Sequence, residues 1–236
     1  MRLLKSLGVM FLGVCAVGVL VVSSASAALP VVLSNPTQEN GQAKAVGTEA
    51  VFETTGKKNV KCKTTSGTST QSGTTSLGKF HIEFKECTTV AAGITFKCSG
   101  LGDATGIILT LGEYHLVEDT LGESEKNSLG VAILFLLEPT HFECAGGFAL
   151  VKVTGNELCL IVEPHVFKTL HELVCSQTSG VPTDKTYWND EEKEVHQGLK
   201  ESEAEGTEVG SAESAKALLL WLNPTGTANV EVSIMG

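Results

Sequence analysis

Short runs in which apolar and polar residues alternate fill most of the chain, and this period of two constrains the fold more than any other feature. In "KFHIEFKE", the apolar residues Phe80, Ile82 and Phe84 share one face of an extended strand, and the residues between them are polar. Similar runs, bounded by Gly, Thr, Ser and Asn, are "NVKCKTT", "GITFKCS", "GIILTLGEYHLVE" and "GFALVKVTG". The sequence therefore predicts an all-β protein, either an antiparallel β-sandwich or a distorted barrel.

Four other segments need separate interpretation. "GVAILFLLE" is apolar throughout but has only nine residues, which predicts a strand buried on both faces. "HVFKTLHELV" has apolar residues at helical spacing, but the neighbouring β pattern favours a strand. The Ser/Thr/Gly-rich run from Thr64 to Ser76 is typical of a flexible connection. "ALLLWL" and "ANVEVSI", joined through "NPTGT", predict a C-terminal hairpin.

The N-terminus has the features of a secretory signal peptide. Arg2 and Lys5 precede an apolar stretch of 16 residues, and "ASA" ends at Ala27. A membrane-spanning helix needs about 20 apolar residues, so we expect cleavage and no membrane span afterwards. The prediction is a signal peptide at 1–27 followed by one extracellular or cell-surface domain at 28–236.

The predicted mature chain carries 15 basic against 27 acidic residues, a formal net charge of −12. This charge argues against nucleic acid and anionic membranes as partners, because both require a positive face. Nine of the acidic residues lie between Asp190 and Glu213, so residues 183–214 are predicted to form a long, solvated acidic loop.

Six cysteines remain in the predicted mature chain, and an even number in an exported protein indicates disulfides. Sequence alone leaves 15 pairings open. Cys159 and Cys175 lie at equal distances from Phe167, so they meet if the segment between them forms a hairpin. Cys87 with Cys98 closes the shortest loop between plausible strands, which leaves Cys62 with Cys144.

Two motifs resemble sites but lack part of the required pattern. "GTTSLGKF" at Gly73–Phe80 has the spacing of a phosphate loop, but Phe80 occupies the Mg²⁺-binding position and a strand follows, so we expect no nucleotide cofactor. "HELVC" resembles a zinc-protease helix with cysteine as the second ligand. As a strand it separates His171 from Cys175 by about 13 Å, which excludes one shared zinc ion.

Candidates for chemistry or binding are weak. Two pairs of carboxylates, Glu113 with Glu118 and Asp190 with Glu192, have the residue types of a glycosidase acid–base pair. Nothing else in the sequence indicates that either pair has this role. The acidic "YWNDEEKE" lacks the ordered spacing of a calcium loop. Tyr187 and Trp188 could stack on a cell-wall glycan, with Asp190 accepting hydrogen bonds from its hydroxyl groups.

One group of proteins shares the order of these features. "VKCK", "FHIEFKEC", "FKCSGLGDATGIILT", "VAILFLLEPTHFEC" and "LVKVTGNEL" before Pro164 resemble exported, cysteine-containing β proteins of soil-type actinobacteria. The resemblance runs from about Val60 to the C-terminus. It implies an exported β-rich fold and no activity or site residue, and Cys159 and Cys175 are additional to its usual cysteines.

The sequence thus predicts a secreted or cell-surface binding or structural module without catalytic residues, metal or cofactor. The alternative is a secreted hydrolase, glycan-directed or metal-dependent. An exposed edge strand would also allow self-association.

Overall fold

The computed structural model describes residues 30–37, 40–72, 77–119, 130–145, 149–183, 186–188, 194–196, 198–203 and 209–235, and in these every regular element is a strand. The predicted signal peptide lies outside them. The first nine strands are β1 (Val31–Asn35), β2 (Asn40–Thr54), β3 (Asn59–Cys62), β4 (Thr64–Ser72), β5 (Leu77–Lys85), β6 (Thr88–Ala91), β7 (Ile94–Gly100), β8 (Ile107–Asp119) and β9 (Gly130–Cys144). The others are β10 (Ala149–Ile161), β11 (Leu170–Cys175), β12 (Gln177–Thr178), β13 (Val181–Pro182), β14 (Thr186–Trp188), β15 (Glu194–His196), β16 (Gly198–Glu203), β17 (Val209–Leu222) and β18 (Glu231–Met235).

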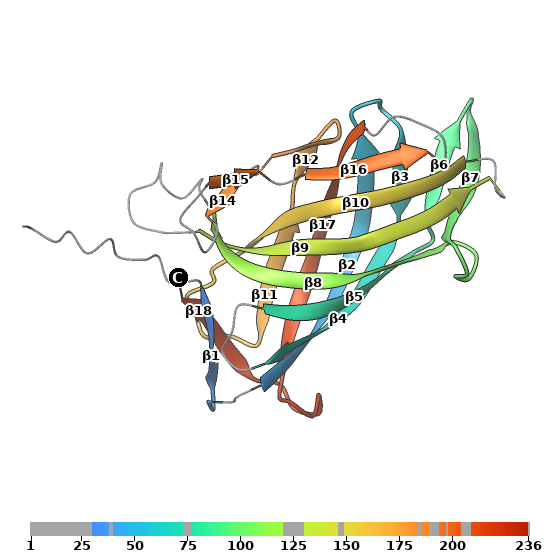
Figure 1. Cartoon of the computed structure of the whole chain (residues 1–236). Coiled ribbons are helices and arrows are strands. Elements are labelled where there is room, and N and C mark those ends of the chain that lie inside the picture. Colours follow the sequence, from blue (N-terminus) through green and yellow to red (C-terminus); the bar gives the residue numbers. More distant parts are fainter. Residues whose placement is uncertain are drawn as a thin grey trace, which may run out of the picture.

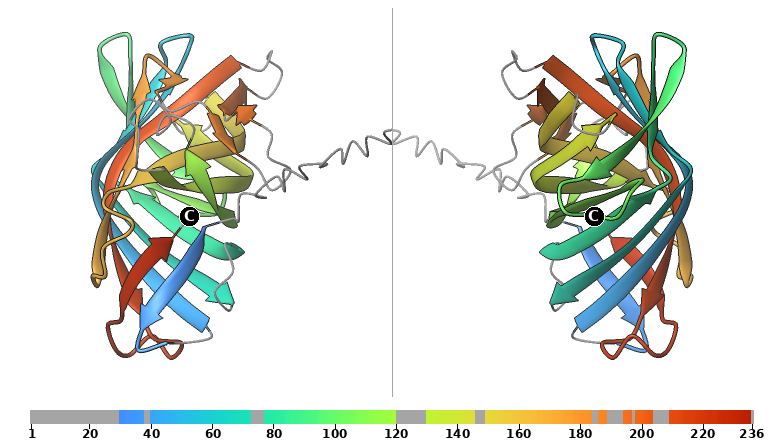
Figure 2. Two further views of the ribbon diagram at one scale, coloured as in Figure 1. Left: turned by 90° about the vertical axis from the view of Figure 1, so that its left-hand side faces the viewer. Right: turned by 90° about the vertical axis from the view of Figure 1, so that its right-hand side faces the viewer.

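One large antiparallel sheet contains most of these strands, in the order β11-β17-β16-β10-β9-β7-β6-β3-β2-β4-β5-β8-β14-β15. Three additional pairings, β11–β10, β17–β2 and β9–β8, join strands that are distant in this order. The sheet therefore curls and closes on itself, as Figures 1 and 2 show. The all-β prediction is confirmed, but the closed sheet is not a clean barrel.

The irregularity comes from two long strands that change neighbours along their length. The first part of β9 pairs with β8, whereas Phe142–Cys144 pairs with β7. The first part of β2 pairs with β4, and its residues Ala50–Glu53 pair with β3. The sheet thus closes by two routes, one at each end of the molecule, and both routes share β2, β9, β10 and β17.

A two-stranded sheet of β1 and β18 covers one end of the closed sheet (Figure 1). Val32, Val232 and Ile234 from these strands are buried in the same core cluster as Trp221 of β17. The loop after β10 fastens this cover, because Lys168 and Val232 exchange two backbone hydrogen bonds of 3.1 and 3.0 Å. The predicted C-terminal turn is present, but β18 pairs with β1. The residues just before β18 meet the end of β17 through an isolated bridge between Leu222 and Asn229, with backbone hydrogen bonds on either side of it.

The predicted strands are confirmed. "KFHIEFKE" lies in β5 with Phe80 buried and His81 exposed, and the consecutive residues 131–134 of β9 are all buried. "HELVC" lies in β11, so it is a strand and not a helix.

Two predicted loops contain strands. Thr64–Ser72 is β4, paired on both sides with β2 and β5, so the interpretation as a flexible connection was wrong for these residues. The rest of that run, 73–76, lies outside the described residues. The acidic segment 183–214 was predicted as a loop, but its described parts form β14, β15, β16 and the start of β17. In both segments, hydrogen bonds to neighbouring strands outweigh the Ser, Gly and acidic residues that suggested a loop.

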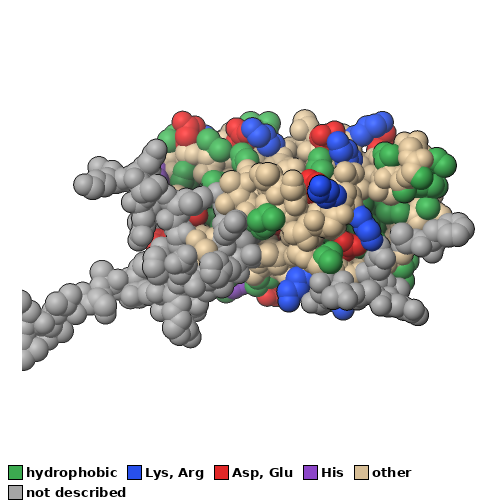
Figure 3. Space-filling model, turned by 90° about the horizontal axis from the view of Figure 1, so that it is seen from above, with side chains coloured by type: hydrophobic (Ala, Val, Ile, Leu, Met, Phe, Trp, Pro, Cys, Tyr) green, Lys and Arg blue, Asp and Glu red, His purple; other side chains and the backbone are tan. Residues whose placement is uncertain are grey.

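No helix long and apolar enough to cross a bilayer occurs in the described part of the chain. On the face shown in Figure 3, basic and acidic side chains are interspersed, and apolar side chains gather at the end where β6 and β7 lie. Val90 and Ile94 of that hairpin are among the exposed apolar residues.

Candidate functional site

The inner face of the closed sheet surrounds a cavity of about 110 Å³. Along each strand every second side chain points inward, so residues at alternate positions form its wall. The space exists because four inward positions on the neighbouring strands β2 and β17 carry only alanine: Ala43, Ala45, Ala215 and Ala217. Small side chains here leave a void that a larger residue would fill.

The rest of the wall is mostly apolar and aromatic. Strands β4, β5, β8, β9, β10 and β11 complete it, and its large apolar and aromatic side chains are Phe80, Ile82, Phe84, Tyr114, Ile133, Phe135, Leu137, Leu173, Leu219 and Trp221. Phe80 and Phe135 pack edge to face with ring centroids 5.0 Å apart. The quadrupoles of the two rings favour this orientation, which holds both rings in the wall.

A second void of about 50 Å³ adjoins the cavity on the side of β3. The two voids share Phe84, Thr110, Leu137 and Glu213 in their walls. For comparison, an engineered apolar cavity of about 150 Å³ accommodates a benzene molecule. The larger void, at about 110 Å³, is of the same order, so it offers space for a molecule of about one ring.

Two carboxyl groups face this apolar space, Glu157 from β10 and Glu213 from β17. Glu157 is 3% exposed. Burial raises the pKa of Glu213 to about 7, because its charged form loses hydration in the interior. Burial also raises the pKa of Tyr114 to about 12, and a hydrogen bond with Ser69 opposes that shift. Near neutral pH, Glu213 therefore exchanges a proton easily, whereas Tyr114 remains protonated.

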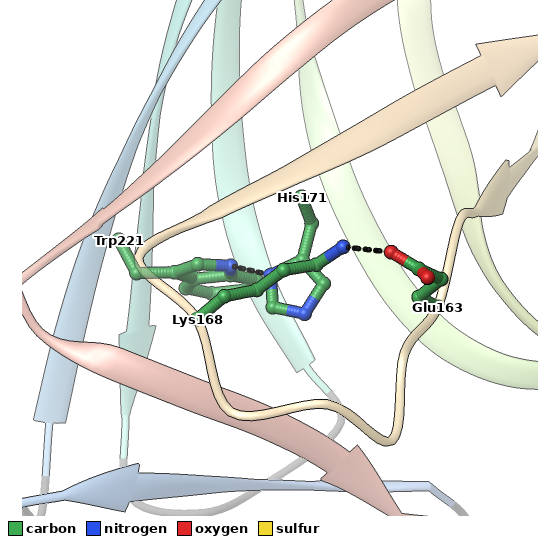
Figure 4. Close-up of polar contacts among 4 residues, drawn as sticks. All are labelled: Glu163, Lys168, His171 and Trp221. Carbon is green, nitrogen blue, oxygen red and sulfur yellow. Dashed lines mark hydrogen bonds and ion pairs between the residues drawn. The ribbon is translucent and has the colours of Figure 1, made fainter.

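Trp221 is held in the wall by His171 (Figure 4). The indole Nε1–H donates a hydrogen bond of 3.0 Å to His171 Nδ1, and the two rings pack edge to face. His171 is fully buried, and burial, with a smaller contribution from Lys168, lowers its pKa to about 4. A neutral His171 is required because only an unprotonated Nδ1 accepts this hydrogen bond. Lys168 and Glu163 form an ion pair of 2.7 Å beside these rings.

The disulfide between Cys159 and Cys175 is part of the cavity wall. The two residues face each other across β10 and β11, so the predicted pair is confirmed. The hairpin turns between these strands, as the symmetric spacing indicated. The bond covalently links β10 and β11, two strands that border the cavity.

The other two predicted pairings were wrong, because the disulfides join Cys62 to Cys87 and Cys98 to Cys144. The registers of β3–β6, β6–β7 and β7–β9 place all four cysteines in one row across the sheet. A bond between Cys87 and Cys98 would leave Cys62 and Cys144 three strand spacings apart, about 14 Å. A disulfide spans at most about 7 Å between Cα atoms, so only the observed pairing joins all four.

Of the residues predicted for glycan binding, the structure describes the side chain of Tyr187 alone, and Tyr187 is not among the residues that line the cavity. Tyr187 is buried among Val117, Leu134 and Leu158, so its ring does not present a face for stacking. The side chain of Trp188 and all of Asp190 lie outside the described residues. The glycan platform therefore stays a prediction that depends on Trp188.

Other sequence candidates are separated by the fold. Glu113 is exposed and Glu118 is buried on β8, and their spacing places them on opposite faces, so they do not form an acid–base pair. Asp190 and Glu192 lie outside the described residues. Cys175 is bound in a disulfide, so it has no thiolate to offer zinc beside His171. The described part of the phosphate-loop pattern, residues 77–80, lies in strand β5.

Sequence reasoning missed Glu157 and Glu213, the two carboxyl groups that the fold brings to one cavity. Glu213 was assigned to the acidic loop. A signal was nevertheless present in the sequence. Alternate residues of a strand share one face, and residues 213, 215, 217, 219 and 221 are such a set, which places Glu213 on the same face as Leu219 and Trp221. Comparison with known protein families, with curated proteins and with solved structures found no match for this chain.

Proposed function

We propose that this protein is a non-catalytic, exported binding module that holds a small, largely apolar molecule inside its closed sheet. The observation that carries the proposal is the cavity of about 110 Å³ lined by the inner face of the closed sheet. Natural cores are packed with few voids larger than a water molecule. An empty void of this size lowers the stability of the fold, and a bound ligand would restore the lost contacts. Closed sheets of about eight strands are a suitable size to enclose one small ligand.

The chemistry of the wall supports this function. Small-molecule sites are typically apolar and aromatic with a few polar groups that fix the orientation of the ligand. The cavity has this composition, with Phe80, Phe135 and Trp221 around it and Glu213 at the junction of the two voids. Three disulfides suit an oxidising compartment, which supports the extracellular or cell-surface location predicted from the N-terminus.

The test is thermal unfolding of the oxidised mature protein, residues 28–236, with ethylbenzene as the apolar probe. At ten times Kd, binding contributes about 1.4 kcal/mol and raises Tm by roughly 3 to 6 °C for a chain of this size. Ala217→Leu adds three carbons inside the cavity and is expected to abolish this shift.

The matched control is Lys216→Leu, which adds a leucine at the next position on the exposed outer face. It is expected to keep the full shift. The shift caused by ligand, and not Tm itself, is compared because an added side chain can strain the wall. Absence of a shift in the wild-type protein, or an equal shift in Ala217→Leu, would contradict the proposed function.

One observation favours a second function, a glycan-directed hydrolase. Glu157 and Glu213 face the same cavity, and a carboxyl with a raised pKa suits a general acid. The small, mostly apolar cavity disfavours this role, because a glycosidase must hold sugar rings on both sides of the scissile bond and pair their hydroxyl groups. We expect no release of reducing sugar from cell-wall glycan, and release abolished by Glu213→Gln would establish the hydrolase instead.

A further inference from the structure

The charge of the cavity wall has one sign. Glu157 and Glu213 are its ionisable carboxyl groups, and no Lys, Arg or His occurs among the described residues that line it. The predicted mature chain is also strongly acidic, with 15 basic and 27 acidic residues. The surrounding field and the local groups therefore both favour a positively charged guest over a neutral or negative one.

Glu213 is the carboxyl placed to meet such a guest. It lies where the larger and the smaller voids adjoin, so its side chain can be reached from both. None of the described residues donates a hydrogen bond to its carboxyl group or forms an ion pair with it. A buried carboxylate without a donor is unfavourable, and a ligand that brings a donor or a positive charge would remove that cost.

Aromatic rings supply the other part of the site. Phe80 and Phe135 form an edge-to-face pair in the wall, and Trp221 is oriented by its hydrogen bond to His171. The faces of such rings attract ammonium groups and also pack well against hydrocarbon. The wall thus combines a counter-ion with surfaces that accept both ends of an amphipathic cation.

We propose that the cavity binds a compact apolar amine in its ammonium form, with Glu213 as the counter-ion and the aromatic wall around the apolar body. The inference rests on the proposed function, that the cavity holds a small molecule, and adds the charge of that molecule. The described residues of the wall offer no basic side chain to pair with a carboxylate or a phosphate ligand.

Three ligands of similar shape test whether the positive charge of the ligand contributes to binding. Ethylbenzene, benzyl alcohol and benzylamine share a phenyl ring and have equal numbers of non-hydrogen atoms, but only benzylamine carries a positive charge. Binding of each to the oxidised mature protein is measured by isothermal titration calorimetry at pH 8. We expect benzylamine to bind about ten-fold more tightly than ethylbenzene, with benzyl alcohol between them.

Glu213→Gln keeps the shape of the side chain and removes its charge. It is expected to weaken benzylamine binding about ten-fold and to change ethylbenzene binding by less than about two-fold. Glu113→Gln removes a carboxylate from the exposed face of β8 and is the matched control, expected to leave all three affinities unchanged.

The outcomes separate this inference from the proposed function. If ethylbenzene binds and benzylamine binds no better, the cavity is a ligand site but the inference about charge is wrong. If none of the three probes binds, the proposed function and this inference both fail. The comparison of probes in the wild-type protein decides the matter even if Glu213→Gln does not fold.

Discussion

Replacing Glu213 by Gln tests whether this carboxyl is as buried as the cavity requires. Burial raises the pKa of Glu213 to about 7 in the folded protein, from an ordinary value of 4.5. Between these values the folded state holds a proton that the unfolded state has lost. The contribution of Glu213 to stability is therefore fully present below pH 4.5 and is lost as the pH rises to 7.

The size of this loss follows from the shift. Each pKa unit corresponds to about 1.4 kcal/mol, so a shift from 4.5 to about 7 corresponds to about 3 kcal/mol. This value is an upper limit, because Glu213 is half-buried and its partial exposure weakens the effect of burial on the pKa. Gln does not titrate, so the variant lacks this dependence on pH.

Urea unfolding at several pH values between 4 and 8 measures the effect. The free energy of unfolding of the wild-type protein minus that of Glu213→Gln is expected to fall by up to about 3 kcal/mol across this range. Glu113→Gln, which removes a carboxylate from an exposed position on β8, is measured in parallel as the control for the substitution itself. A difference for Glu213→Gln that does not change with pH would refute the burial of this group.

Two further predictions concern the wall of the cavity. His171 has a pKa of about 4 in the folded protein against an ordinary 6.5, so the unfolded state takes up the proton first and stability is lost as the pH falls from 6.5 to 4. The stability of the wild-type protein relative to His171→Gln should fall by up to about 3 kcal/mol over that range in urea unfolding, and a rise would contradict the assignment. Removing the disulfide with Cys159→Ser and Cys175→Ser, which are 16 residues apart, should cost about 3 kcal/mol in the same assay at pH 7. An unchanged midpoint would show that this bond does not restrict the unfolded chain.

The local features of the fold could be predicted from the sequence because they depend on neighbours along the chain. The alternation around Phe80 predicted β5, and the symmetry around Phe167 predicted the bond between Cys159 and Cys175. The other two disulfides could not be predicted in the same way. They join β3 to the residue before β6 and β7 to β9, and Cys98 and Cys144 are 46 residues apart.

The candidate site depends on contacts that are more distant still. Four small alanines leave a void only because β2 and β17 lie side by side, although more than 150 residues separate them in sequence. Glu213 looked like one of many solvated acidic residues until the register of β17 placed it on the inner face. The alternation along β17 could have predicted that Glu213 points inward. It could not have predicted which residues lie opposite Glu213 across the cavity.

The most direct test of the central claim is a crystal of the oxidised mature protein soaked with bromobenzene. The anomalous signal of bromine locates the probe without any assumption about its site. We predict a bromine peak inside the closed sheet, between Ala217 and Phe135. Bromine peaks confined to the outer surface, with side chains filling the interior, would contradict the existence of a ligand cavity and with it the proposed function.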